Sequence, residues 1–470
     1  MRFPSRPCGA LAAATAGALL ALAGCARPAP KPNVLFLVAD DLRPALGSYG
    51  NPVVQSPHID GLAAAGVRFD RAYAQFPLCS PSRVSLLLGR YPAATGVLDN
   101  AAFFRDLDPE AVTLPQHFRR HGYVALRAGK IFHEGVEDEA SWDAGPGLRD
   151  GDAERLSWEA LQERRAAGAR EWGFDLERPW KPVRGKGENL LDARIAAQAI
   201  ELLEQYRDRP FFLGVGFLKP HTPFLCPKRF FDLYKPKAMP LPPDFAPRPT
   251  VGPGVPAAAL TQRNGDLLSG DTRITKLEAR AATAAYYACV SATDDQVGRV
   301  LSALDRLGLR ERTLVVFLGD HGFHLGEKGK WSKHGSLYEV GTRVPLVIAG
   351  PGVPAGGVSP RTVELVDVYP TLVELAGLPM PAGLHGQSLL PLLRDPSAPW
   401  EHPAFSATTN PAGRSIRTER WRYTEWEGED GGAELYDETA DPHELTNRVR
   451  DPEHRQIVAA LQRRLAEANP

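Results

Sequence analysis

Short, continuous apolar runs that end abruptly in charged residues limit the folds open to this chain more than any other feature. Three of them are N-V-L-F-L-V-A at 33–39, P-F-F-L-G-V-G-F at 210–217 and T-L-V-V-F-L-G at 313–319. Runs of this kind are typical of strands buried on both faces of a parallel sheet. Between them, 190–207 and 274–307 have the periodicity of amphipathic helices. Strands that alternate with helices predict an α/β fold, with a mostly parallel sheet sandwiched by helices.

Weaker patterns complete this layout. Further strands are expected at 123–128 and 344–349, and helices at 113–120, 153–168 and 363–377. The long stretch 274–307 is expected to be broken or kinked. We expect the polar region 134–189 to be an elaboration over the functional face, because insertions there shape substrate choice.

The C-terminal part has a different pattern. Residues 414–426 alternate as strands do, and a last helix is expected at about 453–468. We therefore predict a catalytic domain at 33–395 and a small C-terminal subdomain with an antiparallel sheet at 396–470. With 470 residues, 43% of them hydrophobic, the chain is long enough for this division.

The net charge of −1 provides no basic field for nucleic acid, so no nucleic-acid partner is expected. A polyanionic substrate would have to be bound by side chains close to it, because the whole surface would not attract it.

The N-terminus has the features of a targeting segment. Arg2 and Arg6 precede an apolar run at 10–23 that is short for a membrane span. It ends in L-A-G-C, which resembles the bacterial lipobox. We expect 1–24 to be a lipoprotein signal peptide, Cys25 to be lipidated, and 25–32 to be a Pro-rich spacer. The protein would then be anchored by lipid in the bacterial cell envelope, periplasmic or at the outer membrane or surface. A plain cleaved signal with an incidental cysteine is the alternative.

Polar side chains suited to catalysis or ligand binding follow the predicted strands. Ligands of such sheets bind at the carboxyl ends of the strands. These side chains are Asp40 and Asp41, Lys130 and His133, Lys219 and His221, and Asp320 and His321. Three carboxylates favour a hard cation, calcium or magnesium. Arg83, Lys130 and Lys333 could neutralise a tetrahedral anion, and His133 and His221 suit proton transfer near neutral pH.

A further candidate lies in P-L-C-S-P-S-R-V-S-L-L-L-G-R at 77–90. Cys79 comes just before an expected helix start, with Ser80 as its cap and Pro81 in its first turn. A nucleophile at a helix N-terminus faces an anion-binding site. A buried cysteine on an ordinary helix is the alternative.

The stretch C-x-P-S-R-x-x-x-L-x-G-R closely resembles the signature of type I, formylglycine-dependent sulfatases. Leu88 departs from it, because threonine is usual before the glycine. D-D-L-R-P, G-K-x-F-H, K-P-H-x-P-F, D-H-G-x-x-L-G-E, W-x-K and S-I-R-T-x-x-x-R-Y-T resemble the iduronate-2-sulfatase-like branch, in the same order. The resemblance covers nearly the whole chain after the spacer and implies an alkaline-phosphatase-like fold.

The resemblance also implies site roles. Cys79 would be converted to formylglycine by a formylglycine-generating enzyme. One Ca²⁺ would be held by residue 79 with Asp40, Asp41, Asp320 and His321. Arg83 and Lys130 would steady the aldehyde hydrate, and Lys333 and His221 would contact the sulfate ester. His221 would protonate the leaving oxygen and His133 would accept the hydrate's second proton. The substrate would be a sulfated saccharide, such as a 2-O-sulfated uronic acid.

Two other functions fit parts of these patterns. One is a phosphonate or phosphate ester hydrolase on the same fold, for which Asp320 and His324 give a D-x-x-x-H. The other is a catalytically silent, glycan-binding lipoprotein, which would gain force if Cys79 stayed a thiol. Cys226 and Cys289 could pair in an oxidising compartment, although their spacing does not establish a disulfide.

Overall fold

The computed structural model describes residues 31–147, 180–261 and 273–470. The described residues from 32 onward form one compact unit. The expected signal peptide, the expected lipidation site Cys25 and the helix expected at 153–168 lie outside the described residues. Within the described residues, no helix is both long and apolar enough to cross a membrane.

A seven-stranded sheet forms the centre of this unit. Its order is β3 (Val124–Gly129), β5 (Phe211–Phe217), β1 (Asn33–Ala39), β7 (Thr313–Gly319), β8 (Arg343–Ala349), β2 (Gly66–Tyr73) and β9 (Gly357–Glu364). Only β8 runs against the others in this sheet, since it is antiparallel to both β7 and β2. Ala39 pairs with Phe217 and with Gly319, so the central strands end level with one another. The side chains that follow these strands are therefore gathered at one edge.

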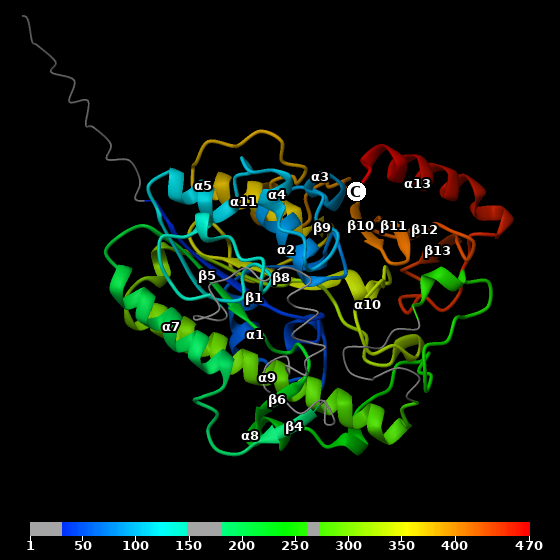
Figure 1. Ribbon diagram of the computed structural model, residues 1–470, viewed down its shortest axis with the longest axis horizontal. Coiled ribbons are helices and arrows are strands. Elements are labelled where there is room, and N and C mark those ends of the chain that lie inside the picture. Colours follow the sequence, from blue (N-terminus) through cyan, green and yellow to red (C-terminus); the bar gives the residue numbers. More distant parts are fainter. Residues whose placement is uncertain (1–30, 148–179, 262–272) are drawn as a thin grey trace, which may run out of the picture. The chain divides into compact units, whose positions relative to one another are not determined.

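Helices cover both faces of the sheet, as predicted (Figure 1). Leu35 and Leu37 of β1 pack in the core that includes α1 (Pro57–Ala64), α7 (Leu191–Tyr206) and α9 (Lys276–Arg306). Val34 and Phe36 pack in the opposite core. The helices there are α2 (Cys79–Leu88), α4 (Phe104–Leu107), α5 (Leu114–Arg120), α11 (Val368–Leu375) and α12 (Leu390–Arg394). This two-sided burial explains why β1 is a continuous apolar run.

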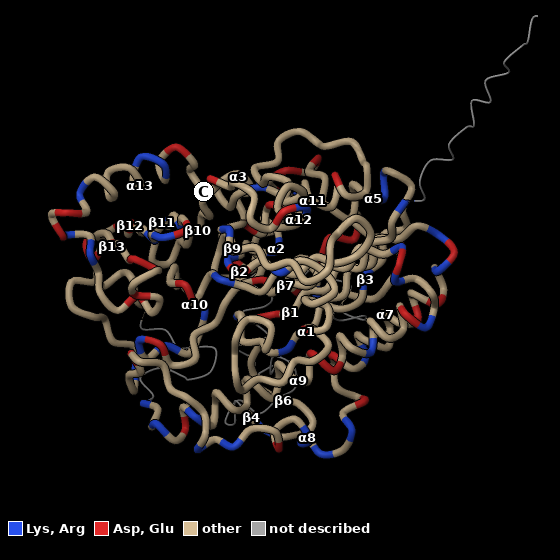
Figure 2. The backbone as a smooth tube through the Cα atoms, turned by 180° about the vertical axis from the view of Figure 1, so that it is seen from behind, with Lys and Arg blue, Asp and Glu red and all other residues tan. Residues whose placement is uncertain are grey.

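The C-terminal antiparallel sheet is also present. Its strands are β10 (Ala404–Thr409), β11 (Ala412–Arg417), β12 (Trp421–Trp426) and β13 (Gly432–Asp437), and α13 (Arg455–Ala468) packs on it (Figure 2). The amide of Ala407 donates to the carbonyl of Gln75, which joins β10 to the segment after β2. Residues 396–470 belong to the same compact unit as the large sheet, and the domain boundary near residue 396 stays a prediction.

A few elements differ from the sequence predictions. Residues 276–306 form one uninterrupted helix, so the expected break is absent. The helix predicted from residue 363 begins at 368, because Val363 and Glu364 complete β9. Apart from 3-10 turns, the other short elements of the described residues are α3 (Pro92–Thr95), β4 (Trp180–Val183), β6 (Phe224–Pro227), α8 (Lys228–Phe231) and α10 (Glu339–Thr342).

Cys226 on β6 and Cys289 on α9 are buried, free thiols in this structure. Burial and a hydrogen bond with Cys289 raise the pKa of Cys226.

Candidate active site

Two adjacent carboxylates stand at the end of β1. The amide of Asp40 donates to Phe217 and extends the ladder, whereas Asp41 turns into the left-handed region with a φ of 63°. This conformation is uncommon outside glycine and costs about 1–3 kcal/mol. Two contacts hold it: the amide of Asp41 donates to Asp320 Oδ1 at 3.0 Å, and the Tyr286 hydroxyl donates to the Asp41 carbonyl at 2.8 Å. The turn therefore directs two neighbouring carboxylates into the same site.

Cys79 lies in the first turn of α2, opposite these carboxylates. Its Sγ is 3.3 Å from Asp40 Oδ1 and 3.2 Å from His321 Nε2. Leu78 occupies the N-cap position, so the prediction that Ser80 caps the helix is wrong. Burial and the Asp40 carboxylate raise the pKa of the Cys79 thiol well above its usual range. The thiol is therefore neutral at physiological pH and a poor nucleophile as it stands.

Three buried cations face three buried carboxylates. Arg83 Nε donates to Asp320 at 2.9 Å, Lys130 Nζ to Asp40 at 2.5 Å, and Lys333 Nζ lies 2.9 Å from Asp41. Burial opposes ionisation of Asp40, but Lys130, together with His221 and Arg83, keeps its pKa well below the usual value. Arg83 also donates to the carbonyls of residues 130 and 131, which fixes α2 to the end of β3. The six side-chain charges balance at neutral pH when every carboxyl is ionised.

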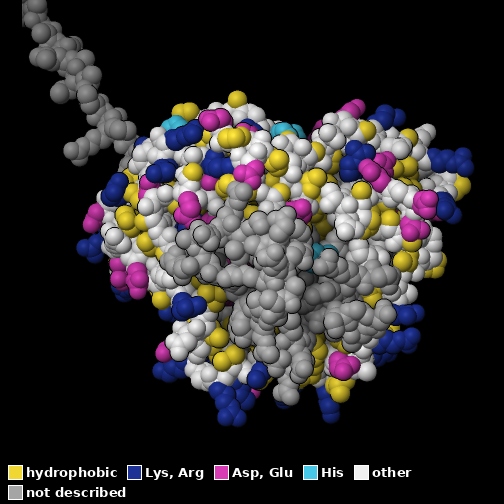
Figure 3. Space-filling view, viewed as in Figure 1, with side chains coloured by type: hydrophobic (Ala, Val, Ile, Leu, Met, Phe, Trp, Pro, Cys, Tyr) yellow, Lys and Arg dark blue, Asp and Glu magenta, His cyan; other side chains and the backbone are white. Residues whose placement is uncertain are grey.

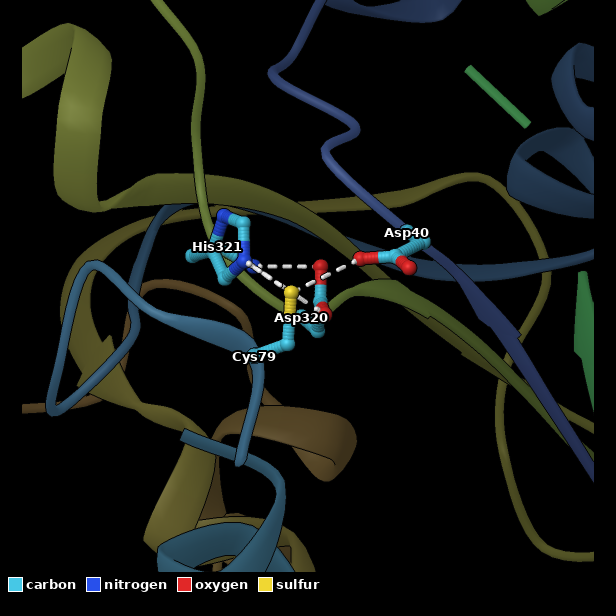
Figure 4. Close-up of side chains that lie close together, drawn as sticks. All are labelled: Asp40, Cys79, Asp320 and His321. Carbon is cyan, nitrogen blue, oxygen red and sulfur yellow. Dashed lines mark hydrogen bonds and ion pairs between the residues drawn. The ribbon is translucent and has the colours of Figure 1, made fainter. Parts of the chain in front are cut away.

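A metal ion fits the centre of this cluster. Asp40, Cys79, Asp320 and His321 each offer a ligand atom, and these atoms lie within 4.8 Å of one another (Figure 4). Burial and the nearby Asp40 raise the pKa of Asp320 to about 7, although the Arg83 and Lys130 charges oppose the shift, and a further cation held between the two carboxylates would relieve their repulsion. His321 Nδ1 lies 3.0 Å from the Gly322 carbonyl; a proton there leaves Nε2 as a lone-pair donor toward the cluster. Carboxylate oxygens dominate the donor set, so a hard cation such as calcium or magnesium suits it best.

Two further histidines border the cluster. His221 Nδ1 is 2.6 Å from the Thr222 carbonyl, and its Nε2 is 3.9 Å from Asp41 Oδ2. His133 is partly exposed, with Lys130 and Asp40 among its electrostatic neighbours. Burial and the Lys130 charge lower the pKa of His133 well below its usual value, so its imidazole is neutral at physiological pH.

The structure brings the sequence-predicted residues to one edge of the sheet. The set is Asp40, Asp41, Cys79, Arg83, Lys130, His133, His221, Asp320, His321 and Lys333. Their catalytic and metal-binding roles stay predictions. His324 is not part of the cluster: its Nε2 is 2.6 Å from the Ser336 hydroxyl and its Nδ1 lies 3.2 Å from the Glu327 carbonyl. Sequence reasoning missed Tyr286 and Asp192, which contact site loops from α9 and α7 and carry no motif of their own.

This sheet, with its metal-compatible cluster at the carboxyl edge, defines the alkaline-phosphatase-like class of hydrolases. A crystallised phosphonate monoester hydrolase of Agrobacterium radiobacter superposes with a TM-score of 0.75 at 25% identity, covering 93% of this chain and 95% of that one. A solved 2-O GAG sulfatase superposes with a TM-score of 0.71 at 25% identity, covering 93% of this chain and 91% of that one.

Sequence comparison identifies the family. The sulfatase family model matches residues 32–378, and the model of the C-terminal part of N-sulphoglucosamine sulphohydrolase matches residues 326–470. Iduronate 2-sulfatase of Mus musculus is 33% identical, covering 91% of this chain and 93% of that protein. The chain belongs to the sulfatase family and is a sulfatase enzyme.

Proposed function

We propose that this sulfatase removes sulfate from a sulfated saccharide, through a formylglycine at position 79 and one Ca²⁺. The observation that carries the proposal is the place of Cys79. Its sulfur lies at hydrogen-bond distance from both Asp40 and His321, at the centre of a buried cluster of carboxylates and cations. The side chain of residue 79 is therefore well placed to act as the nucleophile of the site.

The thiol itself is a poor candidate for that role, because its raised pKa keeps it protonated. Oxidation to an aldehyde, followed by hydration, would replace the sulfur with two hydroxyl groups. One hydroxyl can attack sulfur and the other can lose its proton to expel sulfate and restore the aldehyde. A serine has no second hydroxyl and could not complete the cycle in this way.

The neighbouring side chains suit this chemistry. His221 Nε2 would donate a proton to the oxygen of the leaving sugar as the S–O bond breaks. His133, which is neutral, would take the proton of the second hydroxyl. Lys130 and Arg83 would hold the hydrate, and Lys333 would bind a sulfuryl oxygen.

The ion would be held by Asp40, Asp41, Asp320, His321 and residue 79. When bound, it supplies Lewis acidity and charge at the reacting centre. Because the three carboxylates, when ionised, only balance the three buried cations, a divalent cation would make the site net positive. Acidic and basic side chains are both scattered over the described part of the face in Figure 3, and the whole chain carries only −1. Attraction for an anionic ester would therefore be local to the site.

The substrate class we favour is a 2-O-sulfated uronic acid or a similar unit of a sulfated polysaccharide. It is supported by the likeness to mouse iduronate 2-sulfatase over 91% of this chain and to a 2-O GAG sulfatase structure. The likeness to a phosphonate monoester hydrolase favours phosphonate esters as the second candidate.

Steady-state kinetics with matched esters decide between the two substrates. The proposal predicts a higher kcat/KM for 2-O-sulfated uronic acid disaccharides and for aryl sulfates than for the matching phosphonate monoesters. A higher kcat/KM for the phosphonates would overturn it.

Maturation and location are part of the proposal. A formylglycine-generating enzyme would act on Cys79, and lipid on Cys25 would anchor the mature protein in the bacterial envelope. Radiolabelled fatty acid should enter the wild-type chain in its own host but not Cys25→Ser. Equal labelling of both would refute the anchor.

A further inference from the structure

The loop that carries His221 is held by hydrogen bonds from side chains that have no role in the proposed chemistry. It connects β5 to β6 and spans residues 218–223. The Nδ1 of His221 is 2.6 Å from the Thr222 carbonyl, and a proton on Nδ1 directs Nε2 toward the carboxylate cluster. The position of Nε2 therefore depends on the backbone of this short loop.

Asp192, in the first turn of α7, holds the start of the loop. Its Oδ1 accepts the amide of Leu218 at 2.8 Å, and its Oδ2 accepts the amide of Lys219 at 2.9 Å. The side chain is buried, and burial raises the pKa of its carboxyl although Lys219 opposes the shift. Both oxygens of a buried carboxylate are thus used to fix two consecutive amides at the end of β5.

Lys219 holds the rest of the loop. Its ammonium donates to the carbonyl of His221 at 2.7 Å and to that of Pro223 at 2.8 Å, so its contacts lie at and just beyond the histidine. The carbonyl of Lys219 accepts a hydrogen bond from Thr293 on α9 at 3.1 Å. Two helices and one lysine therefore clamp the six-residue loop.

Charge-assisted hydrogen bonds of this kind are the strong ones, and four of them converge on one loop. A loop that only had to connect β5 with β6 would not need a buried carboxylate and a half-buried ammonium aimed at its own backbone, since withdrawing each charge from water is costly. The side chain that gains from such rigidity is His221.

We propose that Asp192 and Lys219 are positioning residues that hold His221 Nε2 where it can protonate the leaving oxygen. This inference rests on the proposed function, in which His221 is the proton donor. General acid catalysis contributes about 10²–10⁴-fold, and a shift of about 1 Å can cost about 10²-fold. Loss of the Asp192 carboxylate or of the Lys219 ammonium should therefore slow the reactions in which the leaving group needs a proton.

The test compares two sulfate esters with each variant. A 4-nitrophenyl ester releases a stable phenolate that needs no proton, whereas a sugar sulfate releases an alkoxide that does. Asp192→Asn and Lys219→Met should each lower kcat on the sugar sulfate about 30- to 100-fold and change kcat on the nitrophenyl ester less than about threefold. Glu204→Gln removes an exposed carboxylate from the same helix, where Glu204 pairs with Arg306, and should change neither.

His221→Ala provides the reference. It should give the same substrate-dependent loss, and Asp192→Asn should add little to it in the double variant, because both act through one group. If His221→Ala lowers kcat on both esters equally, the proton-donor role in the proposed function fails. If His221→Ala discriminates between the esters but Asp192→Asn and Lys219→Met do not, the positioning role alone is overturned. Should Asp192→Asn fold poorly, Lys219→Met decides by the same criterion.

Discussion

Removing the ammonium of Lys333 tests how the site binds the anion. Lys333 Nζ is 2.9 Å from Asp41 Oδ1 and 3.1 Å from Oδ2, and only 2% of its side chain is exposed. Lys333→Met keeps the apolar stem and removes the charge. Loss of one preorganised donor to a developing negative charge costs about 10²–10³-fold in rate, or about 2.7–4 kcal/mol. We expect that loss in kcat/KM.

The loss should be the same for nitrophenyl and sugar sulfates, because Lys333 acts on the sulfuryl oxygens and those are common to both. This separates Lys333 from His221, whose effect depends on the leaving group. Lys328→Met is the matched control: Lys328 follows β7 on the same loop but pairs with Asp244, away from the cluster. It should stay within about twofold of wild type, the effect expected of a pair remote from the reacting atoms.

The same variant should depend on metal for its stability. Breaking a buried ion pair costs about 3–5 kcal/mol, because the partner charge is left uncompensated. With about 2.1 cal/mol/K of unfolding entropy per residue, 3 kcal/mol corresponds to a Tm lower by about 3 °C for this compact unit. Calorimetry in chelator should show that difference, and Ca²⁺ should reduce it. A kcat/KM within about fivefold of wild type, or a loss confined to sugar sulfates, would refute the account of Lys333.

Two other predictions follow from buried contacts. Burial alone would raise the pKa of Glu339, but Arg417 and Arg422 outweigh it and lower the pKa to about 2 from 4.5. The ionised carboxylate therefore stabilises the fold by about 3 kcal/mol above pH 4.5, and this is lost as the pH falls toward 2. Denaturant titrations should show Glu339→Gln less stable than wild type at pH 7 and nearly equal near pH 2; a pH-independent gap would contradict this. A Cβ at Gly216 would lie 1.8 Å from the Lys130 carbonyl, which accepts from Arg83, so Gly216→Ala should lower both Tm and activity. Gly252→Ala, where the nearest atom is 3.7 Å away, should not, and equal Tm values for the two would refute the reasoning.

Much of the fold could be predicted because burial on both faces leaves a clear pattern. The strands at 33–39 and 313–319 have the predicted bounds, since each is an apolar run bounded by polar residues. The direction of β8 could not be predicted, because V-P-L-V-I-A is equally apolar in either orientation. The sequence places Val363 in a helix because V-E-L-V-D at 363–367 continues directly into the helical V-Y-P-T-L at 368–372 without a glycine or proline between them, whereas in the structure a 3-10 turn at Leu365–Asp367 separates the strand from the helix.

The sequence predicts which residues form the site, but it does not predict how they are held relative to one another. Charged residues after strands must meet at one edge of a parallel sheet, which is why Asp40, Lys130, His221 and Asp320 lie together. The left-handed turn at Asp41 depends on Tyr286, 245 residues away along the chain. Asp192 lies near the start of the predicted helix at 190–207 and carries no motif, and only the fold shows that its carboxylate accepts hydrogen bonds from two amides of a distant loop. Contacts between distant segments leave no local pattern.

We propose that Cys79 becomes the aldehyde that carries the chemistry. Mass spectrometry of the peptide around residue 79, from protein made in its own host, tests it most directly. We expect a mass about 18 Da below that of the cysteine peptide, together with turnover of sulfate esters. An unmodified thiol in protein that still hydrolyses sulfate esters would contradict the mechanism proposed for this site.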